Sequence, residues 1–308
     1  MKIVNYHMTT RRNNKLSPKP SGLNPIKHLG QHFLISSSVV KKIIAAANIR
    51  PGETVLEIGP GTGVLTQALV VAGAVVIAVE KDRGLAEMLK TKMFEIFKIE
   101  NLLKIENCKL KIIVKDILRF NEIQIGKPYK IVANIPYYIT GPIIQKFLFS
   151  KNPPTEMVLM VQKEVGQRIT AQPPRANYLS SLVQSLAEAK MLFKVKKENF
   201  WPRPKVDSAV IRIVTSDKRQ GTSGEKQEYV EFLKVIFKQP RQTLWNNLRR
   251  AKTIPADNLE NVLKELGLEK NMRGQNLNQW QLAAIFQNLA PSDNVKFQSS
   301  NIKPNPKL

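Results

Sequence analysis

A glycine-rich turn is the clearest candidate ligand site in the chain. Residues 57–63 read EIGPGTG and directly follow a short apolar run, 54–58. Glycines let the backbone turn tightly and approach a ligand, because no Cβ stands in the way. The dinucleotide fingerprint G-x-G-x-x-G would need glycine at position 64, where this chain has Val64. The turn therefore predicts a cofactor site and argues against a dehydrogenase.

Acidic residues follow the next two predicted strands. Glu80 ends the apolar run 75–79, and Asp116 follows the run 111–114. A carboxylate at the first position can accept both ribose hydroxyls of an adenosine-type cofactor. The second could accept a hydrogen bond from the adenine amino group, and Asp82 is an alternative to Glu80. Together with Gly59 and Gly61, these residues predict an adenosine cofactor in one crevice at the carboxyl ends of parallel strands.

The run Asn134-Ile135-Pro136-Tyr137 follows the fourth predicted strand and has specific chemistry. Adenine N6 is a poor nucleophile because its lone pair is delocalised into the ring. The amide oxygen of Asn134 and the carbonyl of Ile135 could accept its two N–H groups and orient the nitrogen towards a methyl sulfonium. Pro136 would stiffen the turn, and Tyr137 would stack on an extruded base. We predict catalysis by positioning, without an acid–base pair.

The elements that must hold these residues alternate between strands and helices. Apolar strand-like runs at 54–58, 75–79, 111–114, 130–133 and 156–161 predict a doubly wound, mostly parallel α/β sheet. A helix is expected over 178–189. Two late strands, 191–196 and 208–214, are joined without a long helix, which predicts an antiparallel pair at the sheet edge and seven strands in all.

Composition shifts divide the chain into five parts. Three amphipathic stretches, 229–237, 259–266 and 279–289, predict a small all-α C-terminal domain. We expect the following division: 1–23 a disordered basic tail, 24–215 the cofactor-binding domain, 216–226 a linker, 227–290 the helical domain, and 291–308 a second disordered tail.

Charge indicates the class of partner. Lys and Arg outnumber Asp and Glu by 48 to 24, a net charge of +24, which predicts a polyanion such as RNA. The single cysteine, Cys108, cannot form an intrachain disulfide, and the three histidines lie apart from any ligand cluster, so no metal is expected. The longest apolar stretch, 68–79, is too short to span a membrane. The start carries no secretory signal, so we expect a cytoplasmic protein without a membrane partner.

These motifs together resemble the ribosomal RNA adenine dimethyltransferases, in particular the small-subunit enzymes of bacteria. The resemblance runs from about Lys27 to about Leu289. It includes the following segments: KHLGQHFL at 27–34, EIGPGTG at 57–63, Glu80, Asp116, NIPY at 134–137, QKEV at 162–165 and FWPRPKVDSAV at 200–210. It implies a class I, Rossmann-like fold that binds S-adenosyl-L-methionine.

The resemblance also implies a role for each matched residue. His32 and Leu34 would line the methionine and ribose side of the cofactor, and Gly59 would meet its methionine. Glu80 would bind the ribose, Asp116 the adenine, and Asn134 would stand at the reacting amine, within reach of the cofactor. Tyr137 and Phe200 would stack the target base from two sides. The family often has Asn in place of His32 and Leu in place of Ile135.

The implied activity is dimethylation at N6 of two adjacent adenosines near the 3′ end of small-subunit (16S) rRNA. The implied partner is an immature small ribosomal subunit, with a role late in its assembly, and we expect a monomer. The helical domain would correspond to the family's RNA-contacting lobe, with Arg241, Arg249 and Arg250 near Trp245.

Two alternatives share some of these features. The large-subunit RNA methyltransferases that confer macrolide resistance have the same fold and an Asn-x-Pro-Tyr motif. The runs KVDSAV at 205–210 and RGQNL at 273–277 favour the small-subunit enzyme. An RNA-binding factor without turnover is the other alternative. The chain has all the predicted cofactor and catalytic residues, namely Glu80, Asp116, Asn134 and Tyr137. This favours an enzyme, because a protein that only binds RNA does not need all of them.

Overall fold

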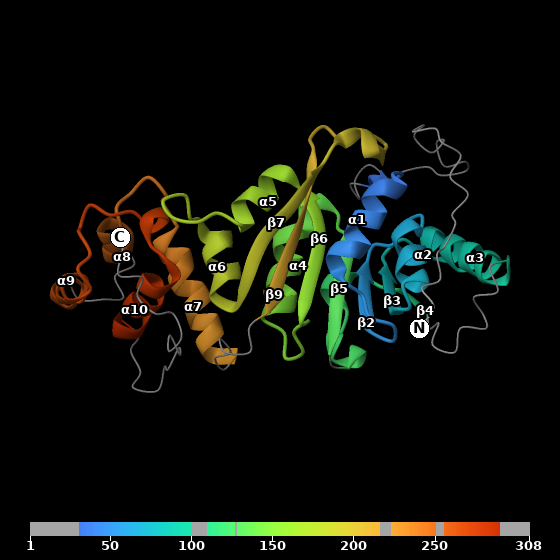
Figure 1. The fold of residues 1–308 in the computed structure, drawn as a ribbon. Helices are drawn as coiled ribbons and strands as arrows, with labels where there is room; N and C mark the ends of the chain where they lie inside the picture. The colour runs from blue at the N-terminus through green and yellow to red at the C-terminus, as the bar shows by residue number, and fades with distance from the viewer. Residues whose placement is uncertain (1–30, 100–109, 127, 216–222, 251–255, 290–308) are drawn as a thin grey trace.

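The computed structural model describes residues 31–99, 110–126, 128–215, 223–250 and 256–289. The predicted terminal tails, 1–23 and 291–308, lie outside these residues, as does Cys108. Within them, a central sheet carries helices on both faces, and a group of helices lies beyond one edge (Figure 1).

The central sheet has seven strands in the order β4-β3-β2-β5-β6-β9-β7, which confirms the predicted doubly wound sheet. Only β9 runs against the others, since it pairs antiparallel with both β6 and β7. The predicted antiparallel pair thus lies at the sheet edge. The strands are β2 (Thr54–Ile58), β3 (Val75–Glu80), β4 (Leu110–Val114), β5 (Tyr129–Asn134), β6 (Glu156–Gln162), β7 (Ala187–Val195) and β9 (Ser208–Thr215).

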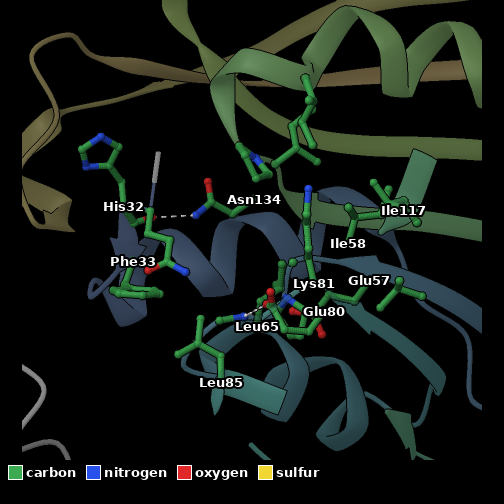
Figure 2. A pocket seen from close by; sticks show the side chains of 18 of the residues that line it. His32, Phe33, Glu57, Ile58, Leu65, Glu80, Lys81, Leu85, Ile117 and Asn134 are labelled. Atoms are coloured by element: carbon green, nitrogen blue, oxygen red, sulfur yellow. Dashed lines mark hydrogen bonds between the residues drawn. The ribbon is translucent and has the colours of Figure 1, made fainter. Parts of the chain in front are cut away.

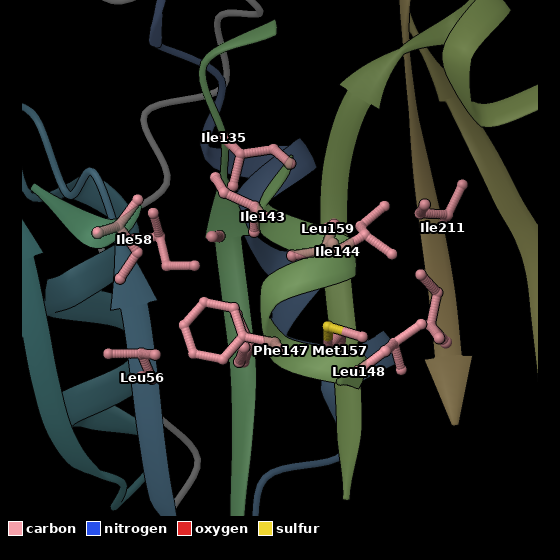
Figure 3. Packing of buried hydrophobic residues seen from close by; sticks show 14 of the residues in the cluster. Leu56, Ile58, Ile135, Ile143, Ile144, Phe147, Leu148, Met157, Leu159 and Ile211 are labelled. Atoms are coloured by element: carbon pink, nitrogen blue, oxygen red, sulfur yellow. The ribbon is translucent and has the colours of Figure 1, made fainter. Parts of the chain in front are cut away.

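Alternate residues of each strand feed two separate cores, one on each face of the sheet. On β2, Leu56 and Ile58 pack against Phe147 of α4 (Figure 3), whereas Val55 packs in the cluster of α1 and α2. Both faces are therefore apolar, which explains the continuous apolar runs in the sequence. The helices of this part are α1 (Ser37–Ala47), α2 (Val64–Val71), α3 (Arg83–Ile99), α4 (Thr140–Leu148), α5 (Lys163–Ile169) and α6 (Tyr178–Leu186).

The boundary between α6 and β7 differs from the prediction. The helix expected over 178–189 ends at Leu186, and the strand begins at Ala187 instead of 191. Ala187 is extended because it pairs with Thr215 of β9 and continues the sheet. Sheet pairing here overrides the helix preference of Ala187 and Ala189, as tertiary contacts often do.

The C-terminal helices share a core with the sheet domain. Tyr229, Leu233 and Phe286 pack together with Leu182, which belongs to α6. The predicted linker 216–226 was too long, because α7 already begins at Ser223. The short helix α8 was not predicted. The helices are α7 (Ser223–Ile236), α8 (Leu244–Arg250), α9 (Ala256–Glu265) and α10 (Gln279–Leu289).

Short elements complete the edge of the sheet where the strands end. The two-residue strand β1 (Phe33–Leu34) pairs antiparallel with β8 (Phe200–Trp201), which joins segments about 170 residues apart. This pairing holds the N-terminal segment against the carboxyl edge. Single 3-10 turns lie at η3 (Ile117–Arg119), η4 (Glu122–Ile125), η5 (Tyr137–Ile139), η6 (Lys197–Asn199) and η8 (Gly274–Asn276).

Candidate active site

A cavity opens at the carboxyl ends of β2, β3, β4 and β5 (Figure 2). It brings together ten of the eleven predicted site residues, namely His32, Leu34, Gly59, Gly61, Glu80, Asp116, Asn134, Ile135, Pro136 and Tyr137. Parallel strands place all their carboxyl ends at one edge, so residues distant in sequence converge there. The crevice predicted from the sequence is therefore present.

The glycine turn forms one wall of this cavity in a backbone conformation that favours glycine. Gly59, Gly61 and Gly63 have φ angles of 63°, 54° and 78°. A Cβ on Gly61 would lie 3.0 Å from Cδ1 of Phe33, and one on Gly63 would lie 2.2 Å from Cδ1 of Leu89. The positive φ angles favour glycine at all three positions, and Gly61 and Gly63 also have close neighbours, whereas Gly59 has room for a side chain.

Glu80 is the carboxylate presented to the cavity from β3. Its Oε2 accepts from the Gly61 N–H at 3.2 Å, and its Oε1 accepts from the Asp82 N–H at 3.0 Å. Burial raises the pKa of this carboxyl, and these two N–H groups oppose the rise. Asp82 does not line the cavity and instead caps α3, its Oδ1 accepting from the Leu85 N–H. The structure therefore favours Glu80 over Asp82 as the ribose acceptor.

Asp116 follows β4, the strand next to the one that carries Glu80, and is held by two donors. Its Oδ1 accepts from the Leu118 N–H at 2.9 Å, and its Oδ2 pairs with Nζ of Lys81 at 2.9 Å. The hydrogen bond from Lys81 is the main cause that lowers the pKa of Asp116. Asp116 is therefore an ionised acceptor in a fixed orientation. Lys81 extends into the cavity in Figure 2 and was not predicted as a site residue.

Asn134 is oriented by the N-terminal segment. Its Nδ2 donates to the backbone carbonyl of His32 at 3.1 Å (Figure 2), which leaves Oδ1 as the acceptor end of the amide. The His32 ring stacks on Tyr137 with centroids 5.8 Å apart, and its Nδ1 bonds the Pro202 carbonyl. The Tyr137 hydroxyl bonds Ser208 at 2.7 Å. Asn134 and Tyr137, two of the residues predicted to contact the target base, are thus held in place before the substrate arrives.

Phe200 is the predicted site residue that the structure does not bring to the cavity. It is only 3% exposed, pairs with Leu34 in the β1–β8 ribbon, and packs in the core beside α1 and α2. It does not line the cavity. Stacking of the target base by Phe200 stays a prediction, one that requires this side chain to turn out of the core.

Glu57 is a buried cavity residue whose role the sequence did not indicate. It is 1% exposed, and its pKa is raised to about 8 by burial, with a further contribution from the charge of Glu80. Thr66 opposes the rise. The side chain of Thr66 lowers the pKa by more than the charge of Glu80 raises it, but burial outweighs Thr66. Glu57 is therefore mostly protonated at neutral pH.

The Glu57→Gln variant should change how stability depends on pH. Because the folded protein holds a proton that the unfolded chain releases, folding stability from Glu57 is lost as pH rises from 4.5 to about 8. Over that range the free energy of unfolding of the wild type should fall, relative to Glu57→Gln, by up to about 1.4 kcal/mol per pH unit. Urea unfolding of both proteins at several pH values measures it. If the difference in free energy of unfolding between the two proteins did not change with pH, the raised pKa of Glu57 would be wrong.

The residues around the cavity fit S-adenosyl-L-methionine. Glu80 and Asp116 end neighbouring strands and offer carboxylate oxygens for a ribose diol and an amino group. The turn at Gly61 forms a cradle that a Cβ would fill. Apolar side chains of Leu34, Ile117 and others line the space between them. This combination of acceptors and apolar walls suits an adenosine moiety.

Most of the chain is similar to known proteins. The profile of the family described as "Ribosomal RNA adenine dimethylase" matches residues 23–291. The chain belongs to this family. The family predicted from the sequence motifs is therefore confirmed, as are the class I methyltransferase fold, S-adenosyl-L-methionine as cofactor and the enzyme class.

Curated relatives and solved structures agree with the family. "Ribosomal RNA small subunit methyltransferase A" of Clostridioides difficile is 37% identical over 257 residues, covering 82% of this chain and 86% of the relative. The protein of the same name from Lactobacillus helveticus is 38% identical, covering 85% and 90%. A dimethyladenosine transferase from Plasmodium falciparum (TM-score 0.69, 83% and 96% covered) and the 23S rRNA methyltransferase ErmE (0.65, 83% and 99%) share the fold of this dimethylase at 24% identity.

The described part of this dimethylase offers neither a metal cluster nor a membrane span. Among its described residues, no group of three or more His, Cys, Asp or Glu side chains could hold a metal ion. No helix in the described ranges is long and apolar enough to cross a membrane.

Proposed function

We propose that the protein transfers methyl groups from S-adenosyl-L-methionine to N6 of two adjacent adenosines near the 3′ end of small-subunit (16S) rRNA, two to each. The family and its small-subunit relatives support this activity. The observation that carries it is Asn134, whose amide is fixed by the His32 carbonyl in the cavity that the glycine turn and Glu80 also line.

The residues of the chain act mainly by positioning. When bound, the cofactor supplies a methyl group on a sulfonium, with a neutral thioether as leaving group. Oδ1 of Asn134 and the carbonyl of Ile135 accept the two N–H bonds of the target amine and direct its lone pair at the methyl carbon. Glu80, Asp116 and the glycine turn would hold the cofactor, whose sulfonium would give up the methyl group to the nitrogen and leave as the thioether, and the nitrogen would release one proton to solvent. Tyr137 holds the ring of the extruded base in plane.

The product identifies the reaction. Incubating the protein with labelled S-adenosyl-L-methionine and rRNA, and digesting the RNA to nucleosides, should give N6,N6-dimethyladenosine as the main labelled product. Label in any other nucleoside, or N6-monomethyladenosine as the final product with excess cofactor, would contradict the proposal.

The partner and setting follow from this substrate. We propose that the partner is an immature small ribosomal subunit, that the enzyme acts on it as a monomer late in assembly, and that it works in the cytoplasm. The division of labour is also proposed: residues 24–215 carry the chemistry and 227–290 contact RNA. The described part of 227–290 supports this by exposing eight cations, Lys234, Lys238, Arg241, Arg249, Arg250, Lys264, Lys270 and Arg273. Nζ of Lys270 lies 4.7 Å from the centroid of Trp245.

RNA binding should depend steeply on salt. Each phosphate contact releases condensed counterions, so three contacts on single-stranded RNA should weaken binding about 20-fold between 50 and 200 mM salt. Replacing Arg249 and Arg250 with alanine should reduce the slope of log K against log salt. Filter binding of small-subunit rRNA measures both. A flat salt response in the wild type would remove the case for phosphate contacts.

A further inference from the structure

We propose that Tyr138 and Leu118 form a second base subsite at the mouth of the cavity, which stacks the nucleotide next to the target adenosine. This inference rests on the proposed function and adds a binding site for the RNA beside the reacting base.

Tyr138 is an exposed aromatic in an unusual place. It lines the cavity and is 55% exposed, whereas its neighbour Tyr137 points inward and bonds Ser208. Both lie in the 3-10 turn η5, where successive side chains diverge by about 120° because the turn has three residues per revolution. The two tyrosines therefore present rings to different spaces, one inside the cavity and one at its rim.

An apolar side chain and two lysines, Leu118, Lys81 and Lys115, line the same cavity as this ring. Leu118, 39% exposed, also lines the cavity, and it follows Lys115 and Asp116 on the same rim. The ion pair with Asp116 raises the pKa of Lys81, and Tyr138 adds to the rise, so the phenol lies within electrostatic range of that ammonium. The charge of Arg119, which is exposed at the end of η3, lowers the pKa of both Lys81 and Asp116.

This combination suits single-stranded RNA. Exposed aromatic rings flanked by Lys and Arg bind unpaired nucleotides, because the ring stacks on the base while the cations meet the phosphates. The reaction requires one adenosine to leave its stack and enter the cavity, which exposes a face of its neighbour. Tyr138 and Leu118 offer that face an apolar surface directly outside the cavity.

Substitution of Tyr138 separates stacking from chemistry. With small ribosomal subunits as substrate, Tyr138→Ala should raise the KM for RNA about 5- to 100-fold, the usual loss for one stacked base. Affinity for S-adenosyl-L-methionine should be unchanged, and Tyr138→Phe should behave like the wild type. Phe94→Ala is the matched control, since Phe94 is 60% exposed on α3, away from the cavity.

A modified RNA tests the contact itself. A short single-stranded RNA with two adjacent adenosines is compared with one whose second base is removed, using binding in the presence of S-adenosylhomocysteine. The wild type should bind the RNA that lacks the second base more weakly than the intact RNA. Tyr138→Ala should bind the two RNAs equally. Equal losses in both proteins, or a Tyr138→Ala variant with normal KM, would overturn the subsite. Failure of the proposed function would appear as absence of methylation by the wild type. Failure of the subsite would appear only in the comparison of the wild type with Tyr138→Ala.

Discussion

Replacing Asn134 with alanine should lower the rate of methyl transfer by at least about 100-fold and leave cofactor affinity within about twofold of the wild type. The amide is held by His32 and presents Oδ1 to the cavity, so its loss removes an acceptor that stabilises the reacting amine. Losses of about 10² to 10³ are typical when one preorganised hydrogen-bonding group is deleted from an active site. Single-turnover transfer and calorimetric titration of S-adenosyl-L-methionine measure the two quantities.

A second asparagine provides the control for this experiment. Asn121 caps η4 by accepting a hydrogen bond from the Ile123 N–H, and it is exposed and does not line the cavity. Asn121→Ala should therefore keep normal transfer. If Asn134→Ala lost cofactor affinity in proportion to rate, Asn134 would be a binding residue and its proposed role at the amine would be wrong.

Glu80→Gln should weaken binding of S-adenosyl-L-methionine by about 100-fold. A ribose diol donates two hydrogen bonds to the ionised carboxylate, and hydrogen bonds to charged groups contribute about 1.5–3 kcal/mol each. In the wild type the carboxylate accepts hydrogen bonds from the N–H groups of Gly61 and Asp82. The neutral amide would point its own N–H group at one of these two donors. The glycine turn should therefore be disturbed as well. Titration calorimetry at fixed pH measures the loss.

Glu87→Gln tests whether loss of any glutamate charge has the same effect. Glu87 is exposed on α3, pairs with Lys90 and does not line the cavity. This variant should bind the cofactor normally. Equal binding by Glu80→Gln and wild type would show that the ribose is held elsewhere, with Asp82 as the next candidate.

Much of the fold could be predicted because its signals are local. Strands buried on both faces appear as continuous apolar runs, and their boundaries were found within one residue at β2, β3 and β4. In a parallel sheet the residue after each strand lies at one edge, so Glu80, Asp116 and Asn134 could be assigned to one cavity before any contact was known.

The remaining features depend on contacts between distant segments. The bond from Asn134 to His32 joins residues 102 positions apart, and the β1–β8 pairing that places His32 spans a still longer separation. Burial of Phe200 follows from the same pairing. The protonation of Glu57 depends on packing around it, and Lys81 looks like any surface lysine until its pairing with Asp116 is seen. No residue pattern in the sequence reports such contacts.

The most direct test of the account is methylation of small ribosomal subunits that lack the modification. The purified protein is given labelled S-adenosyl-L-methionine together with unmethylated small subunits and, separately, with large subunits, and the labelled positions are mapped. We predict N6,N6-dimethyladenosine at two adjacent positions near the 3′ end of the small-subunit rRNA and no label in the large subunit. Label confined to large-subunit RNA would assign the resistance-type activity instead, and no transfer to either would contradict an enzymatic role.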